Sequence, residues 1–202
     1  MPFLSPHEYS PIDQSVTGPI FGWEHTFARH GVLSDGSCFF YSLCAAFNVQ
    51  DFLHRSMDEQ RAIATNVRCR LVENAKHAAR FNELAAEYGE HLPTLAVKGR
   101  FCNYHVTAEE PMIRFAMERL RVNLYFLDAT SGRLHCNVHG NPKHPTAILA
   151  WIDHKHFEPI GLVLPNKELG SAAPSLRFVF DPSEPLVQRA KEASRCNAKL
   201  MH

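Results

Sequence analysis

Apolar residues recur at helical spacing in several segments of this chain. Ile63, Val67 and Leu71 repeat every four residues after a capping-box pattern at residues 56–59, and the two patterns together predict an amphipathic helix. A second capping-box pattern begins at Thr107 and precedes another apolar stripe. The helices predicted from these patterns cover residues 37–48, 57–76, 77–88 and 107–120.

The later part of the chain carries apolar, β-branched runs of strand length. The clearest run is interrupted by the polar residues 153–155 and resumes at His156. Pro159 has no N–H group for a ladder, which predicts a sheet edge or a bulge at this position. Because helices come first and strands follow, the chain predicts an α+β domain. The predicted strands cover residues 122–127, 133–138, 146–152, 156–164 and 176–180.

Turn-forming residues divide the chain into three parts. Residues 1–22 are rich in proline, serine and glycine and predict an extended N-terminal arm. Residues 23–164 form the predicted domain, in which 89–106 lack periodicity and predict a loop. Residues 165–202 predict a C-terminal extension with one strand and a short helix over 184–196.

Composition narrows the class of protein. A chain of 202 residues with 45% hydrophobic content suits one domain with a real core. The formal net charge of zero argues against a non-specific nucleic-acid surface. No apolar segment has the length of a membrane span, and the N-terminus lacks a signal-peptide pattern. We therefore expect a monomer in the cytoplasm, or in the host cytoplasm for a pathogen effector.

Six widely spaced cysteines do not predict a disulfide framework in a chain of this length. One of them stands out, because Asp35-Gly36-Ser37-Cys38 places it after a tight turn and at the start of an apolar helix. The first N–H groups of a helix have no internal partner, and the helix dipole is positive there. Both effects stabilise a thiolate, and the same N–H groups can hold an oxyanion. Cys38 is therefore a candidate nucleophile, although a lone cysteine is more often a buried structural residue.

A partner for that thiol lies near the other end of the chain, where two predicted strands meet. A cysteine with a distant histidine, here His156, is one chain order in which a nucleophile and its base come together. Glu158 lies two residues farther on the same strand face, where its carboxylate can orient the imidazole. His154 is a rival base. We favour His156, because the apolar run restarts there and a base needs fixed geometry.

The two blocks Asp35-Gly36-Ser37-Cys38-Phe39-Phe40 and His156-Phe157-Glu158 resemble those of the ovarian-tumour (OTU) family of cysteine proteases, most of which are deubiquitinases. The resemblance covers residues 25–164 in order and spacing. It implies a papain-like fold with a central small mixed β-sheet flanked by helices. Residues 23–164 would then be the catalytic domain.

The same resemblance implies a role for each residue of the two blocks. Cys38 would be the nucleophile and His156 the general base. Either Asp35 or Glu158 would be the third catalytic residue, the first by shaping the oxyanion loop and the second by orienting His156. The implied substrate is ubiquitin, a polyubiquitin chain or a ubiquitin-like modifier, and no metal or organic cofactor is implied. The oxyanion loop would consist of Asp35, Gly36 and Ser37.

Three other functions stay open at this point. The same fold could act without catalysis as a ubiquitin-binding module, which an intact Cys38 and His156 argue against. A papain-like hydrolase or acyltransferase could use the same pair on a different amide. A zinc-dependent binding protein is the third alternative, although no strong zinc spacing is present. Its candidate ligands would be His135, Cys136, His139, His144, His154 and His156.

Overall fold

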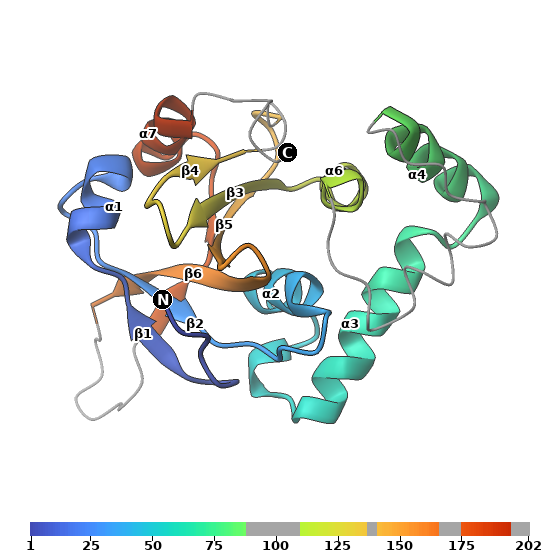
Figure 1. The fold of residues 1–202 in the computed structure, drawn as a ribbon, viewed down its shortest axis with the longest axis horizontal. Helices are drawn as coiled ribbons and strands as arrows, with labels where there is room; N and C mark the ends of the chain where they lie inside the picture. Colours follow the sequence, from blue (N-terminus) through green and yellow to red (C-terminus); the bar gives the residue numbers. More distant parts are fainter. Residues whose placement is uncertain (88–109, 137–140, 166–174, 195–202) are drawn as a thin grey trace.

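We describe a computed structural model of the chain over residues 1–87, 110–136, 141–165 and 175–194. Its strands form one mixed sheet in the order β1-β2-β6-β5-β3-β4, with β7 added to β6 and β8 added to β5 (Figure 1). β3 and β5 are parallel, and the other described pairs are antiparallel. The strands are β1 (Tyr9–Pro11), β2 (Phe27–His30), β3 (Asn123–Asp128), β4 (Leu134–His135), β5 (Thr146–Ile152), β6 (His156–Leu164), β7 (Ser175–Arg177) and β8 (Val179–Phe180).

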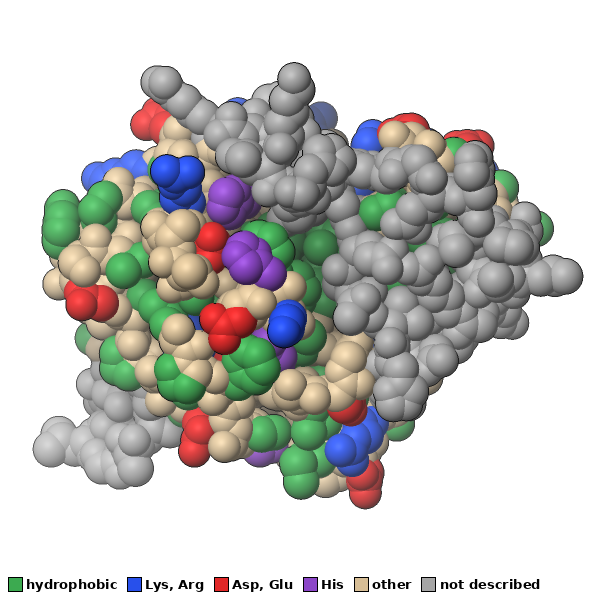
Figure 2. All heavy atoms as spheres, in the orientation of Figure 1, with side chains coloured by type: hydrophobic (Ala, Val, Ile, Leu, Met, Phe, Trp, Pro, Cys, Tyr) green, Lys and Arg blue, Asp and Glu red, His purple; other side chains and the backbone are tan. Residues whose placement is uncertain are grey.

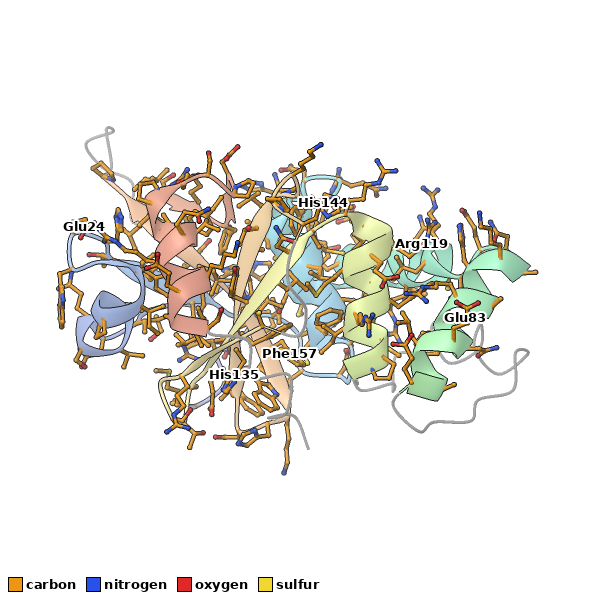
Figure 3. All side chains as sticks on the ribbon, turned by 90° about the horizontal axis from the view of Figure 1, so that it is seen from above. Glu24, Glu83, Arg119, His135, His144 and Phe157 are labelled. Atoms are coloured by element: carbon orange, nitrogen blue, oxygen red, sulfur yellow. The ribbon has the colours of Figure 1, made fainter. Side chains whose placement is uncertain are left out.

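Helices lie on both sides of this sheet. Viewed from above (Figure 3), α1 and α7 lie on one side, α2 and α6 on the other, and α4 lies beyond α6. The fold is therefore a mixed sheet between helical layers, as the sequence predicted. The helices are α1 (Gln14–Phe21), α2 (Cys38–Ala46), α3 (Met57–Leu71), α4 (Ala75–Glu87), α6 (Glu110–Leu120) and α7 (Pro185–Ser194), with a short 3₁₀ helix at Phe52–His54.

Both faces of the central strands are buried, which explains their continuous apolar sequence. Leu124 and Leu149 point into the core beneath α2 and α6. Their neighbours Tyr125 and Ile148 point into the opposite core, beneath α1 and α7. Successive strand residues alternate between the two cores, so every position of β3 is buried.

Several predicted elements are confirmed with shifted ends. The helix predicted over 57–76 ends at Leu71, and its capping box is formed by Ser56 and Glu59. The helix predicted over 77–88 begins two residues earlier, at Ala75. The second predicted capping box and the loop predicted over 89–106 lie outside the described residues. None of the described helices combines the length and the apolar character that a membrane crossing requires.

Two features of the fold differ, wholly or in part, from the sequence-based expectation. The segment expected to be extended, 1–22, contains β1 and α1, and its Ile12 and Phe21 enter the core. Pro159 lies at a local edge, although β6 as a whole is an inner strand between β2 and β5. The proline is tolerated where it is because β2 pairs with β6 only from Ile160 onward.

One hydrogen bond ties α2 to β6. The Ser42 hydroxyl donates to the backbone carbonyl of Phe157 at 2.9 Å, in a fully buried setting. Ser42 lies one helical turn after Cys38, and Phe157 follows His156 directly. This bond therefore fixes the position of the first turn of α2 relative to the first residues of β6.

We expect Ser42→Ala to lower the free energy of unfolding by about 1 kcal/mol, because a buried hydrogen bond is lost while the helix-forming propensity is kept. Urea denaturation followed by circular dichroism measures the change. Ser15→Ala, at an exposed position of α1, is the matched control and should change the free energy by less than about 0.5 kcal/mol. Equal effects of the two variants would contradict a special role for Ser42.

Candidate active site

Cys38 is the first residue of α2 and is 7% exposed. The preceding turn has Gly36 at φ 82°, a left-handed conformation that favours glycine. The first hydrogen bond of the helix runs from the Tyr41 N–H to the Ser37 carbonyl. Helix geometry therefore leaves the N–H group of Cys38 without an intrahelical acceptor. The thiol itself faces the Lys155 carbonyl at 3.9 Å.

His156 reaches this thiol from the start of β6. It is 2% exposed and forms a side-chain hydrogen bond with Cys38. The preceding β5–β6 turn contains Asp153 and His154, both with positive φ. His154 is exposed on this turn, where its ring meets Trp151 edge-on at 4.4 Å between centroids. The structure thus brings His156, rather than His154, to the cysteine.

Glu158 is fully buried behind His156. One of its oxygens, Oε1, lies 3.6 Å from the His156 Nε2 atom and accepts the Leu4 N–H at 2.8 Å. The other oxygen, Oε2, accepts from Arg29 Nη1 at 2.7 Å, inside the sheet. A buried carboxylate needs such compensation, because removing a charge from water is costly.

Asp35 supports the loop before the helix. Its carboxylate accepts from the Tyr41 hydroxyl at 2.8 Å and from the Ser37 N–H at 3.3 Å, and Arg61 Nε lies 3.5 Å away. Buried Arg68 also donates to the Ser37 hydroxyl. Glu158, not Asp35, is therefore the carboxylate placed against His156, while Asp35 holds the turn that carries the thiol.

Two titrations set the chemistry of this arrangement. Burial alone would lower the pKa of His156, but the hydrogen bond with Cys38 and the negative charge of nearby Glu158 outweigh it and raise that pKa to about 9. Burial raises the pKa of the Cys44 thiol, one and a half turns farther along α2, to about 12. At neutral pH His156 is therefore held as an imidazolium beside Cys38, and Cys44 stays an unreactive thiol.

The sequence alone did not single out several residues that build the site. Arg29, Arg68 and Ser42 are buried polar residues. Arg29 lies in a segment for which the sequence predicted no element, and the other two lie in predicted helices. Leu4 acts through its backbone N–H, so its side chain gives no signal. Among the described residues, no three His, Cys, Asp or Glu side chains come close enough together to hold a metal ion.

Figure 2 shows histidine side chains gathered in the middle of the face over the β5–β6 turn, beside acidic and basic groups. Together with the buried pair of Cys38 and His156, this region offers a thiol, an imidazolium and the N–H group at the start of a helix. Such a set can perform nucleophilic attack on a carbonyl and stabilise the resulting oxyanion.

No protein-family model matches the chain, and no curated protein matches it. Solved structures of OTU domains resemble it. An OTU domain in complex with ubiquitin has a TM-score of 0.48 and 14% identity, covering 85% of this chain and 84% of that chain. The Hazara virus OTU bound to ubiquitin has a TM-score of 0.49 and 14% identity, covering 70% and 84%. The viral OTU domain protease from Dera Ghazi Khan virus has a TM-score of 0.46 and 17% identity, covering 77% and 87%.

We expect Arg29→Met to lower the free energy of unfolding by about 3–5 kcal/mol, because it leaves the Glu158 carboxylate buried without its cation. Arg55→Met is the matched control, since Arg55 pairs with Glu59 at 3.5 Å on the exposed surface. Its loss should cost less than about 1 kcal/mol. Thermal and urea denaturation compare the two, and similar losses would contradict the structural weight given to the buried pair.

The charge of His156 should depend on Cys38. In the wild type, NMR titration of the His156 ring should give a pKa of about 9. Cys38→Ala removes a hydrogen bond that raises this pKa, while burial still lowers it, so the titration should move toward more acidic pH. Cys44→Ala is the control and should leave the titration unchanged.

The same shift has a consequence for stability. Because the folded-state pKa lies above the unfolded value of 6.5, the stabilisation from His156 is complete below pH 6.5 and is lost as the pH rises through about 9. The free energy of unfolding should therefore fall over this range in the wild type and fall less in Cys38→Ala. An identical pH dependence in both proteins would contradict the coupling.

Proposed function

We propose that this protein is a cysteine-type deubiquitinase that cleaves isopeptide bonds at the ubiquitin C-terminus. The observation that carries the proposal is the hydrogen-bonded pair of Cys38, at a helix start, and His156, backed by buried Glu158. The choice of ubiquitin comes from the resemblance of the Asp35–Phe40 and His156–Glu158 blocks to OTU proteases. The fold resemblance to OTU domains is compatible with it.

Acylation follows from the placement of the charges. The Cys38 thiolate attacks the carbonyl carbon of the isopeptide bond, and a C–S bond forms as the carbonyl π electrons move to oxygen. The backbone N–H groups of Cys38 and the loop before it hold this oxyanion. His156 donates its proton to the lysine nitrogen as the C–N bond breaks, which releases the amine and leaves a thioester.

Deacylation restores the starting state. Neutral His156 takes a proton from water as the water oxygen attacks the thioester carbonyl. The C–S bond then breaks, the sulfur leaves as the Cys38 thiolate, and the ubiquitin carboxyl group is released. The thiolate and the imidazolium face each other again, so no metal or redox partner enters the balance. Glu158 favours the imidazolium at both ends of the cycle.

The hydrogen bond made by the Ser37 N–H limits which N–H groups can hold the oxyanion. It faces the Asp35 carboxylate at 3.3 Å, so it serves the turn itself. We therefore assign the oxyanion to the Cys38 N–H and the Gly36 region of the loop. Asp35→Ala should reduce activity through the turn, and Glu158→Ala should reduce it through His156.

The first test is a covalent one. We expect ubiquitin with a C-terminal thiol-reactive electrophile to form a one-to-one adduct with the wild type, detected by intact-protein mass spectrometry. The reason is that docking places the electrophile beside an activated thiolate. Cys38→Ala should give no adduct, whereas the matched variant Cys44→Ala should react like the wild type.

Each result of that test has a definite meaning. An adduct on Cys38→Ala would overturn the choice of nucleophile. No adduct from folded wild-type protein, together with an adduct from a ubiquitin-like modifier carrying the same electrophile, would move the substrate to that modifier. No adduct from either would leave a hydrolase of another amide, or a binding module that bound ubiquitin without reacting.

A further inference from the structure

The first residues of the chain lie across the back of the catalytic histidine. Figure 1 draws the N-terminal end beside β2 and β6. The Pro2 carbonyl accepts from Arg29 Nη1 at 3.2 Å, and the Leu4 N–H donates to Glu158 at 2.8 Å. Between them, the Phe3 ring lies over the His156 ring with centroids 4.6 Å apart and planes tilted by 33°. Three consecutive residues thus contact the three buried polar groups of the site.

This segment is itself fixed by the chain that follows it. The Ser5 N–H donates to the Glu8 carboxylate at 2.8 Å, and the Glu8 N–H returns to the Ser5 carbonyl at 3.1 Å. The turn passes so close to Gly31 that a Cβ there would lie 2.0 Å from the Ser5 oxygen. The glycine therefore permits the segment to lie where it does.

Hydrogen bonds alone do not fix the imidazole. The His156 Nε2 atom has no hydrogen-bond partner among the described residues, and its distance of 3.6 Å to Glu158 is too long for one. The Leu4 N–H occupies the nearer carboxylate oxygen. The ring is held at one edge by Cys38 and needs a surface against its face to stay in plane.

Phe3 supplies that surface, although its own side chain contributes little to the hydrophobic core. Its own side chain is 43% exposed, yet the His156 ring beneath it is 2% exposed. An aromatic face against an imidazolium is also favourable, because the ring electrons attract the cation. A residue that mainly filled the core would be buried itself.

We propose that Phe3 is a positioning residue of the active site, which holds the His156 ring toward Cys38 and keeps water from its face. Pro2 and Leu4 anchor it through backbone bonds to Arg29 and Glu158. This inference rests on the placement of the Phe3 ring, the His156 ring and the Cys38 thiol relative to one another. Only the readout with ubiquitin rests on the proposed function.

The test measures how fast iodoacetamide alkylates Cys38 across pH, by peptide mass spectrometry. The charged and titratable groups that face or back His156 are Cys38 from α2, Glu158 from β6 and Arg29 from β2. Phe3→Ala should lower the alkylation rate at pH 7 by about 10-fold, because a loosened imidazolium stabilises the thiolate less. It should also move the His156 titration toward acidic pH. Phe3→Tyr should restore both to within about twofold.

Tyr9→Ala is the matched control. Tyr9 also belongs to the N-terminal segment, is 38% exposed and stacks on a buried histidine, His30, with centroids 4.7 Å apart. It lies outside the site, so alkylation of Cys38 should be unchanged. Gly31→Ala is the converse variant, because it displaces the segment without altering Phe3 and should reproduce the loss.

Ubiquitin cleavage gives the second readout. We expect Phe3→Ala to lower kcat and to leave KM within about twofold, since a positioning residue acts on the chemical step rather than on substrate binding. Unchanged alkylation and titration in Phe3→Ala, or equal losses in Tyr9→Ala, would overturn the proposal. If the wild type does not cleave ubiquitin but Phe3→Ala still slows the alkylation of Cys38, the proposed substrate is overturned and this inference stands.

Discussion

The ion pair of Arg29 and Glu158 is the constraint around which the site is arranged. Its atoms lie 2.7 Å apart, and both side chains are almost fully removed from water. Two such charges need further hydrogen bonds to offset the cost of removing them from water. The structure supplies such bonds by bringing β6 together with β2 and the first residues of the chain, both of which lie more than a hundred positions before β6 in sequence. These three segments together set the electrostatic environment of His156.

The second constraint is the doubly buried sheet. Because β5 and β6 are covered on both faces, the turn that joins them has little conformational freedom. The side chain of His156, the first residue of β6, is therefore held in one orientation. On the other side, α2 is buried at every position and is bonded to β6 through Ser42. The thiol and the imidazole therefore meet as a result of packing, before any substrate is present.

Much of this could be predicted from the sequence, and the exceptions share a cause. Cys38 and His156 lie in short local motifs, and strands such as β5 are continuous apolar runs, so their patterns are visible. β2 was missed because Arg29 and His30 interrupt its apolar pattern, although both are buried. The choice of Glu158 over Asp35 against the histidine also needed the fold, since it depends on which carboxylate β2 and the N-terminal segment enclose.

The contacts of Pro2 and Leu4 with the buried ions are made by main-chain atoms. Substitutions at these two positions can accumulate without altering the groups that touch Arg29 and Glu158, provided that the path of the chain over Gly31 is kept and residue 4 is not proline. Relatives of this protein could thus share the same support for the histidine while showing no similarity in their first residues. Gly31, which lies away from the reacting groups, would be the position at which the sequences of such relatives stay the same.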